Sequence, residues 1–401
     1  MTVTTVELDS RSHQLPAGSA AARLAGLDLA ALRARVEAAT DADVERALRR
    51  AAGGGGAGIG PAGAGPGGWR LDDLAVLLSA PAAARLEELA SVAHRLTVRR
   101  FGRTVHLFAP LYLSNQCVSV CTYCGFSAGN EIARRTLAVD EVVAEADALL
   151  ARGFRQVLLV AGEHARIVSK DYLVACVEAL APRVPSLSVE VQVWDTATYR
   201  RLVDAGCDGL VVYQEAYDRD TYAACHLKGK KRNYEWRLGA PDRGAEAGMR
   251  RLGIGALLGL HPDWRSETLA TAAHAVALIH RWWRVEVSVS LPRLRPAAGD
   301  FQAGHPLADR DFVQVLCALR VVLPDVGISL STRESAAFRD ALVPLGVTTM
   351  SAGSHTEPGG YAGPSDAEPQ FEVSDDRSPE VVAATLRRAG YDPVWKDWQR
   401  S

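Results

Sequence analysis

Three cysteines stand close together in the stretch Ser114–Phe126, where their thiolates could bind one metal centre. Cys117, Cys121 and Cys124 follow each other at C-x-x-x-C-x-x-C spacing, directly after the apolar run Val105–Leu113. A structural zinc site needs four ligands, usually supplied by two C-x-x-C pairs, and the second pair is missing here. Three thiolates on a four-iron cluster leave one iron open to a further ligand. The spacing therefore favours an iron–sulfur cluster over zinc.

Composition and charge set limits on the other possibilities. The chain has 401 residues, 48% of them hydrophobic, and a net charge of −2, which favours a sizeable core and no general attraction to nucleic acid or anionic membranes. No apolar run is long enough to span a bilayer, and Met1–Leu15 lacks the features of a signal peptide. The four isolated cysteines are interpreted as small buried side chains; they are Cys176, Cys207, Cys225 and Cys317. We expect a cytoplasmic protein.

An aromatic residue precedes the last clustered cysteine, so the stretch reads C-x-x-x-C-x-Y-C with Tyr123 in the aromatic position. This resembles the signature of the radical S-adenosylmethionine (SAM) enzymes. The resemblance implies a 4Fe–4S cluster on Cys117, Cys121 and Cys124, whose open iron is chelated by SAM. One electron would cleave SAM to methionine and a 5′-deoxyadenosyl radical, which takes a hydrogen atom from the substrate. A zinc or purely structural site, and a non-catalytic electron-transfer protein, are the alternatives.

Strand-like apolar runs alternate with helical patterns through most of the chain. The runs are Val105–Leu113, Gln156–Ala161, Leu187–Val193, Gly209–Tyr213, Gly253–Leu260, Val285–Leu291, Gly327–Leu330 and Val347–Met350. The amphipathic stretches between them include Asp140–Arg152, Lys170–Leu180, Ser266–Trp283 and Asp309–Leu323. Such alternation predicts an α/β fold with a parallel sheet covered by helices, and eight units predict closure into a (β/α)8 TIM-type barrel.

We expect four segments along the chain. They are an N-terminal extension with a Gly-rich linker (1–68), a helical lead-in (69–104), the barrel (105–357) and a tail that closes on it (358–401). Helical patterns outside the barrel occupy Leu24–Ala52, Leu71–Leu78, Ala82–Leu96 and Pro379–Ala389, and residues 1–20 are expected to be frayed. The G-x-G-x-x-G of Gly58–Gly63 follows a helical pattern rather than a strand, so we interpret it as linker.

Polar residues follow several predicted strands, at the end where a β/α barrel holds its functional groups. Gly162 permits close backbone approach, and Glu163 can accept hydrogen bonds from an ammonium group. With Ala161 before them, these residues resemble the Gly-Gly-Glu motif that holds the methionyl amine of SAM. Glu215 is a candidate contact for the cofactor ribose or the substrate amine, with a structural ion pair as the alternative.

Other strand-end residues suit a carboxylate ligand. One of Arg293 and Arg295 is expected to pair with the methionyl carboxylate, and the other to brace the barrel mouth. Arg333 is predicted to bind a substrate carboxylate, because an unpaired buried arginine would be costly, and Ser351 to add a hydrogen bond. Tyr112 is expected near the radical, with a core aromatic role as the alternative.

Longer motifs narrow the resemblance. They are Phe101–Thr104, Pro110–Asn115, Cys121–Ser127, Tyr213–Glu215, His226–Lys231, Ser290–Pro296, Ser331–Ser335, Pro358–Tyr361 and Pro393–Trp398. From Trp69 to the C-terminus the chain resembles the 2-iminoacetate synthase family, tyrosine lyases of thiamine thiazole biosynthesis. The resemblance implies cleavage of the Cα–Cβ bond of L-tyrosine to 2-iminoacetate (dehydroglycine) and p-cresol. It also implies thiazole synthase as the partner that receives the imine, and flavodoxin or ferredoxin as electron donor.

Two relatives within the superfamily are alternatives. A tryptophan lyase would share the amino-acid clamp but not the side-chain pocket. The hydrogenase-maturation tyrosine lyase carries a C-terminal C-x-x-C, whereas this chain has no cysteine after Cys317. The basic run His226–Arg232 is interpreted as a solvated loop, or as contacts across a lid or a partner surface, and not as a nucleic-acid site.

Overall fold

The apolar runs of the sequence form a closed barrel of parallel strands in the structure, a computed structural model that describes residues 15–53, 70–299, 301 and 304–396. The barrel strands are β1 (Thr104–Ser114), β3 (Gln156–Ala161), β4 (Ser186–Glu190), β5 (Gly209–Glu215), β7 (Arg251–Ala256), β8 (Glu286–Ser290), β9 (Gly327–Leu330) and β10 (Thr349–Ser351). They pair in that order, and β10 returns to β1 with Thr349 opposite His106. The predicted eight-stranded barrel is confirmed.

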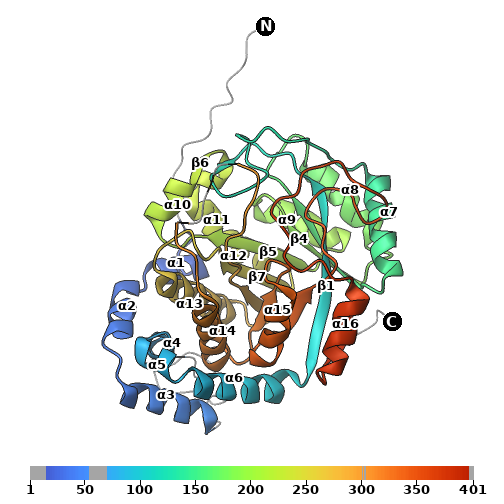
Figure 1. The fold of residues 1–401 in the computed structure, drawn as a ribbon. Helices are drawn as coiled ribbons and strands as arrows, with labels where there is room; N and C mark the ends of the chain where they lie inside the picture. The colour runs from blue at the N-terminus through green and yellow to red at the C-terminus, as the bar shows by residue number, and fades with distance from the viewer. Residues whose placement is uncertain (1–14, 54–69, 300, 302–303, 397–401) are drawn as a thin grey trace.

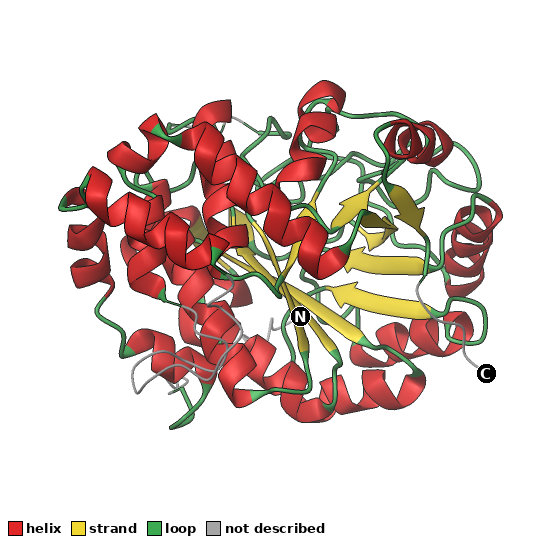
Figure 2. Cartoon of the chain, turned by 90° about the horizontal axis from the view of Figure 1, so that it is seen from below, coloured by secondary structure: helices red, strands yellow, loops and turns green. Residues whose placement is uncertain are grey.

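Helices surround this barrel, as Figure 2 shows. Those between the strands are α7 (Val139–Ala151), α8 (Lys170–Leu180), α9 (Thr196–Ala205), α12 (Ala240–Ala247), α13 (Trp264–Arg281), α14 (Asp309–Val322) and α15 (Ala336–Leu342), with a 3-10 turn at Val343–Leu345. Side-chain caps fix several of the starts. Helix α13 begins two residues before its apolar pattern, because the Asp263 carboxylate accepts a hydrogen bond from the Arg265 backbone N–H at 3.2 Å.

Short elements cover the carboxyl ends of the strands. They are β2 (Val120–Cys121), α10 (Arg219–Cys225), β6 (His226–Lys228), a 3-10 turn at Lys230–Arg232 and α11 (Tyr234–Leu238). Strands β2 and β6 pair antiparallel, so the cysteine stretch and the basic run lie side by side above the barrel. Figure 1 places β6 and α10 at the upper end of the molecule, the end toward which β1 points.

In the described residues before the barrel, six helices form where the sequence predicts helical segments. They are α1 (Ala20–Ala25), α2 (Leu29–Glu37), α3 (Asp41–Ala52), α4 (Leu71–Leu77), α5 (Ala80–Ala84) and α6 (Leu86–Phe101). The expectation of a frayed start is wrong for Ser19 and Ala20, because Ser19 caps α1 and the Asp242 carboxylate accepts the backbone N–H of Ala20 at 3.1 Å. Residues 1–14 and 54–69, including Gly58–Gly63, lie outside the described residues.

The apolar core lies between the strands and their helices, and buries residues such as Leu111, Leu159 and Leu278. Burial of this kind supplies the main driving force for the fold. Within the described residues we find no helix that combines the length and apolar character needed to cross a membrane.

The chain after the barrel returns to both ends of it. Helix α16 (Pro379–Arg388) leads to β11 (Asp392–Val394), which pairs with the first residues of β1. The Tyr361 hydroxyl donates to the Pro110 carbonyl at 2.7 Å, deep in β1. Asp375 forms an ion pair with Arg339 of α15, and both side chains are 0% exposed. The division of the chain at 68, 104 and 357 stays a prediction.

We expect Asp375→Ala to lower the free energy of unfolding by about 3–5 kcal/mol, because it leaves the buried Arg339 guanidinium without its carboxylate. Urea unfolding followed by tryptophan fluorescence measures the change. Asp340→Ala is the matched control: its carboxylate pairs with Arg377 but is 37% exposed, so its loss should cost less than about 1 kcal/mol. If both variants lost the same free energy of unfolding, the buried pair would not contribute more to stability than the exposed one, contrary to this prediction.

Candidate active site at the carboxyl end of the barrel

The cysteine stretch is held as a defined loop above β1. The Asn115 side chain donates to the Ala133 carbonyl at 2.8 Å and accepts the Arg135 backbone N–H at 2.7 Å. The Arg134 guanidinium donates to the carbonyls of Asn115 and Phe126, at 2.6 and 2.9 Å. These contacts hold the backbone at both ends of the loop, and the backbone in turn fixes where the three cysteines lie.

The three clustered thiols lie close enough to influence one another. Burial raises the pKa of Cys117 to about 11 and also raises the pKa values of Cys121 and Cys124, and neighbouring thiols add to the shifts of Cys117 and Cys121. All three are free of disulfides. Neutral thiols are favoured here unless a metal centre binds them as thiolates. Among the described residues no three His, Cys, Asp or Glu side chains form a ligand set for a single ion, whereas three free thiols on one loop suit the thiolate ligation of a larger iron–sulfur cluster.

Gly162 lies against the cysteine loop, as predicted. Its N–H donates to the Ser114 carbonyl at 2.9 Å, and a Cβ atom at this position would lie 2.4 Å from the Gln116 carbonyl oxygen and 3.2 Å from the Cβ of Cys117. A glycine is therefore required for the end of β3 to approach the loop this closely.

Glu163 and Glu215 lie in one network of buried ion pairs. Glu163 accepts hydrogen bonds from Arg237 and from the Ser119 hydroxyl, each at 3.1 Å. Glu215, in the left-handed conformation at φ 71°, accepts from Lys231 at 2.8 Å and lies 3.8 Å from Arg237. Both carboxylates thus have protein partners, which matches the structural ion-pair alternative for Glu215.

Lys231 and Arg237 lie in this network of ion pairs, although the sequence analysis did not predict either as a site residue. The interpretation of the basic run as a solvated loop is wrong for Lys231, because its side chain is 13% exposed and turns inward to Glu215. Burial would lower the pKa of Lys231, but the surrounding carboxylates and Cys121 raise it. The 3-10 turn at Lys230–Arg232 brings this cation to the cysteine loop, and spacing alone gives no signal of such a turn.

Tyr123 is buried against the same loop pair. The His226 Nδ1–H donates to the Tyr222 carbonyl at 2.7 Å, so its Nε2 accepts the Tyr123 hydroxyl at 2.9 Å. Burial lowers the pKa of His226 to about 3, which keeps this ring neutral. The Tyr123 side chain thereby ties the cysteine loop to β6.

Arg293 and Arg295 both bind one buried carboxylate. The Arg293 guanidinium forms a two-pronged contact with Glu334, with Nε 2.9 Å from Oε1, and Arg295 donates to the same carboxylate at 2.8 Å. Glu334 is 2% exposed. In this structure both arginines brace the barrel mouth, and the expected pairing of one with the methionyl carboxylate is untested.

A cavity of about 110 Å³ lies among the strand ends. Six of the predicted site residues line it: Tyr112, Tyr123, Cys124, Glu215, Arg333 and Ser351. Of the others, Gly162 and Glu163 border the cysteine loop, whereas Arg293 and Arg295 face Glu334. The structure therefore brings most of the predicted substrate residues and one cluster cysteine to a single space.

Two cations line this cavity, Lys231, which pairs with Glu215, and Arg333. The Arg333 guanidinium stacks on the Phe371 ring, 3.4 Å from the ring centroid, and burial lowers the pKa of Arg333. Within the part of the chain that the structure describes, no carboxylate or carbonyl accepts a hydrogen bond from this guanidinium. A half-buried fork donor that is held by stacking and has no protein acceptor is suited to a ligand carboxylate.

The returning tail supplies residues that the sequence analysis missed. The Gln370 side-chain carbonyl accepts the Tyr112 hydroxyl at 2.7 Å, and its amide lies 3.8 Å from the Cys124 sulfur. Gln370 therefore links Tyr112 of β1 to Cys124, a predicted cluster ligand that lies 246 residues away from it in sequence. No local pattern near Gln370 indicates this contact.

Glu190 is a second residue that was missed. It ends β4 opposite Val160 of β3, and its side chain lines the cavity with Arg333. Burial, with a smaller contribution from Glu215, raises the pKa of Glu190 to about 7. The sequence analysis missed it because the predicted strand runs on to Val193, whereas the observed strand β4 ends at Glu190.

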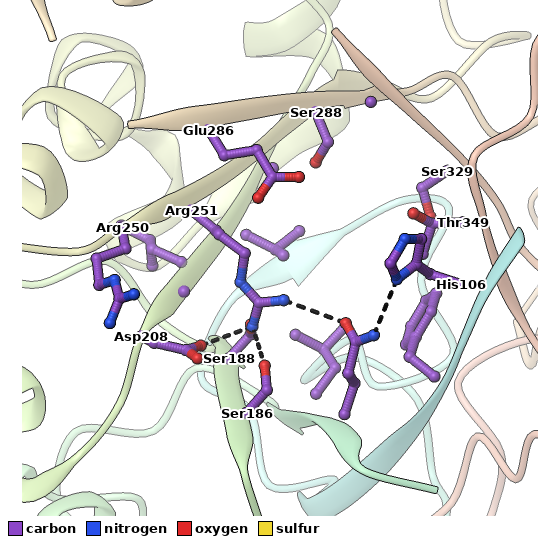
Figure 3. A pocket seen from close by; sticks show the side chains of 18 of the residues that line it. His106, Ser186, Ser188, Asp208, Arg250, Arg251, Glu286, Ser288, Ser329 and Thr349 are labelled. Atoms are coloured by element: carbon purple, nitrogen blue, oxygen red, sulfur yellow. Dashed lines mark hydrogen bonds and ion pairs between the residues drawn. The ribbon is translucent and has the colours of Figure 1, made fainter. Parts of the chain in front are cut away.

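A larger cavity of about 560 Å³ opens at the amino end of the strands and is shown in Figure 3. Arg251 is the centre of a polar network in it and donates to Asp208 at 2.6 Å, to Gln156 at 3.1 Å and to Ser188 at 3.2 Å. The predicted site residue Tyr112 and the cysteines do not line it. Because this face of a β/α barrel serves stability and the opposite face serves chemistry, we assign the active site to the smaller cavity.

We expect Gly162→Ala to reduce the iron bound after anaerobic reconstitution, because the new methyl would press on the Gln116 carbonyl and displace the cysteine loop at a cost on the order of 1–3 kcal/mol. Iron and sulfide analysis per chain measures the effect. Gly129→Ala, where a Cβ meets nothing within 4 Å, is the matched control and should bind iron as the parent does. Full iron content in Gly162→Ala would contradict the role of this close approach.

Comparisons with known proteins agree with this geometry. The Radical SAM superfamily profile matches residues 111–275, and the Biotin and Thiamin Synthesis associated domain profile matches residues 290–392. A solved structure of HydG, a maturase of the FeFe-hydrogenase, superposes with a TM-score of 0.84 at 32% identity, covering 92% of this chain and 79% of that one. Methylornithine synthase shares the fold at a TM-score of 0.68 and 22% identity, covering 81% of this chain and 94% of its own.

Two curated relatives match over nearly their whole length. The 2-iminoacetate synthase of Escherichia coli K12 is 44% identical over 372 residues, 93% of this chain and 94% of the relative. The 2-iminoacetate synthase of Salmonella typhimurium is 43% identical, over 92% of this chain and 93% of the relative. Identity of this extent, joined to the cysteine loop and the barrel that presents it, shows that the chain belongs to the 2-iminoacetate synthase family of radical SAM lyases.

Proposed function

We propose that this chain cleaves the Cα–Cβ bond of L-tyrosine to give 2-iminoacetate and p-cresol, as a step in thiazole formation for thiamine. The observation that carries the proposal is Arg333, a half-buried guanidinium with no acceptor among the described residues, in the same cavity as Cys124. Such a group selects a substrate carboxylate and holds it beside the cluster loop. An α-amino acid bound this way has its amine and its side chain in fixed directions.

The family's cofactors are a 4Fe–4S cluster and SAM, which together supply a 5′-deoxyadenosyl radical when bound. In this chain Cys117, Cys121 and Cys124 would hold the cluster, and Gly162 leaves room for the loop that carries them. The chain's main contribution to rate is orientation, because a substrate fixed near the reacting atom needs no further ordering.

Aromatic and polar groups of the cavity are proposed to receive the rest of tyrosine. Tyr112 is held in one orientation by its hydrogen bond to Gln370 and by edge contact with Phe126, whose ring centroid is 5.8 Å away. Ser351 ends β10 in the cavity wall, and its carbonyl is fixed by Arg339. The Arg333 guanidinium, stacked on Phe371, lines the same cavity as Ser351. We therefore assign Ser351 and Arg333 to the substrate carboxylate.

Further roles are proposed for the remaining mouth residues. We assign Glu163 and Glu215 to the cofactor side, where Arg237 and Lys231 balance their charge. Tyr123 would pack beside the cofactor, and Arg293 with Arg295 would hold the barrel mouth through Glu334.

Partners follow from the chemistry of the product. A free imine hydrolyses in water, so 2-iminoacetate is best passed directly to thiazole synthase, and cleavage of SAM requires an electron from a flavodoxin or ferredoxin. Both partners would be found in a reducing, cytoplasmic setting, which also preserves the free thiols.

The direct test is anaerobic reconstitution with iron, sulfide, reductant and SAM, followed by product analysis with tyrosine and, separately, with tryptophan. We expect p-cresol and 5′-deoxyadenosine from tyrosine. A methylindole from tryptophan in place of p-cresol would overturn the substrate assignment. Cys121→Ala is the control without a competent cluster and should give neither 5′-deoxyadenosine nor p-cresol.

We expect Arg333→Ala to weaken tyrosine binding by about 2–5 kcal/mol, as is usual when one partner of a buried charge pair is removed. Arg333→Lys keeps the charge but loses the two-pronged donor and the stacking on Phe371, so we expect an intermediate loss. Equilibrium dialysis of the holoenzyme against tyrosine measures both. Wild-type affinity in Arg333→Ala would remove this residue from the substrate site.

A further inference from the structure

Carboxylates are common at the mouth of this barrel, and most have a cation beside them. Glu163 pairs with Arg237 at 3.1 Å, Glu215 with Lys231 at 2.8 Å, and Glu334 with Arg293 and Arg295. A buried carboxylate without such a partner is costly, because burial removes the water that stabilises its charge.

Glu190 departs from this pattern. In the described part of the chain its carboxylate accepts no hydrogen bond and forms no ion pair, although it lines the cavity together with Arg333 and Tyr213. Burial raises the pKa of Glu190 to about 7, so in the free enzyme this carboxyl group is only partly ionised near neutral pH. A cationic ligand in the cavity would supply the missing partner.

The same cavity holds an unpaired cation. Arg333 also lacks an acceptor among the described residues, and the two groups interact electrostatically across the cavity. They come from different strand ends, β4 for Glu190 and the turn after β9 for Arg333. One unpaired anion and one unpaired cation facing a shared space complement a zwitterion, and an α-amino acid carries its ammonium and its carboxylate on neighbouring atoms.

We propose that Glu190 receives the α-ammonium group of the substrate while Arg333 receives its carboxylate, so that the pair selects an α-amino acid and fixes its nitrogen. This rests on the proposed function. Glu163 and Glu215 are poorer candidates for this task, because their oxygens already accept hydrogen bonds from Arg237, Ser119 and Lys231.

The amine contact has a mechanistic consequence. The proposed product is an imine, whose nitrogen carries one hydrogen fewer than the amine of tyrosine, so the group that holds this nitrogen also sets which of its hydrogens faces the cofactor. Arg333 alone would leave rotation about the bond between Cα and the carboxylate. A second anchor at Glu190 removes that freedom and leaves the aromatic side chain to the remaining wall of the cavity.

The test compares two ligands that differ only in the amine. Tyrosine and its desamino analogue, 3-(4-hydroxyphenyl)propanoate, are bound to reconstituted holoenzyme, and their affinities are measured by anaerobic equilibrium dialysis. We expect Glu190→Gln to weaken tyrosine binding about 30-fold or more, as expected for loss of a buried charge partner, and to leave the analogue within about twofold of the wild-type value. Glu286→Gln is the matched control, a carboxylate of β8 in the opposite cavity, and should keep the wild-type preference for tyrosine.

Several outcomes would overturn the proposal. One is a Glu190→Gln variant that still prefers tyrosine over the analogue as the wild type does. Another is a Glu190→Gln variant that binds SAM more weakly but tyrosine as tightly as the wild type, which would assign Glu190 to the cofactor site. If wild-type enzyme forms no p-cresol yet prefers tyrosine through Glu190, the proposed reaction fails while the ligand assignment stands.

A measurement on unaltered enzyme guards against a variant that does not fold. The titratable and charged groups facing Glu190 are Tyr112 of β1, Tyr213 and Glu215 of β5, Lys231, Arg237 and Arg333. The pKa values of both tyrosines and of Lys231 are raised by their surroundings and that of Glu215 is lowered, which leaves Glu190 to change charge near pH 7. Because only the ionised form of Glu190 binds the ammonium group, the affinity for tyrosine relative to that for the analogue should rise at least threefold between pH 6 and 8. The rise should be no steeper than about tenfold per pH unit, since one group ionises. A flat ratio would contradict the proposal.

Discussion

Burying a charge in a protein is costly unless an opposite charge comes with it, and the carboxyl end of this barrel buries many charges in a small space. The structure meets this constraint by pairing. Arg237 lies between Glu163 and Glu215, Lys231 adds a second cation to Glu215, and Glu334 holds the two arginines that follow β8. The pairing fixes the loops that carry these residues, so the cysteine loop has a rigid surface beneath it.

A charged group of the barrel mouth that has no protein partner is therefore a candidate ligand-binding group. Arg333 is half-buried and stacked on Phe371, yet its donors meet no acceptor in the described chain. It shares its cavity with Cys124 of the cluster loop and Tyr112 of the first strand. A site of this kind is preorganised, since its cation is already desolvated and oriented before a carboxylate arrives. The ligand completes a charge balance that the protein leaves open.

The chain after the barrel completes the site from a distance. Gln370 bonds Tyr112 and approaches Cys124, and Phe371 supplies the ring under Arg333. This segment is anchored by the buried Arg339–Asp375 pair, and Arg339 also bonds the Ser351 carbonyl. One buried ion pair thus holds the tail, the end of β10 and the cavity wall together, which explains how a segment without regular structure can contribute precise contacts.

The sequence by itself determined the barrel and its chemistry, because both depend on local patterns. Alternating apolar runs fix strands and helices, C-x-x-x-C-x-x-C places three thiols on one loop, and strand ends converge on one face. The tertiary structure alone decided which charges find partners. Arg293 and Arg333 look alike in sequence, yet the first meets Glu334 and the second faces the cavity. Lys231, Gln370 and Glu190 entered the site through contacts between distant segments, and the energy of a buried charge depends on those neighbours and not on its place in the chain.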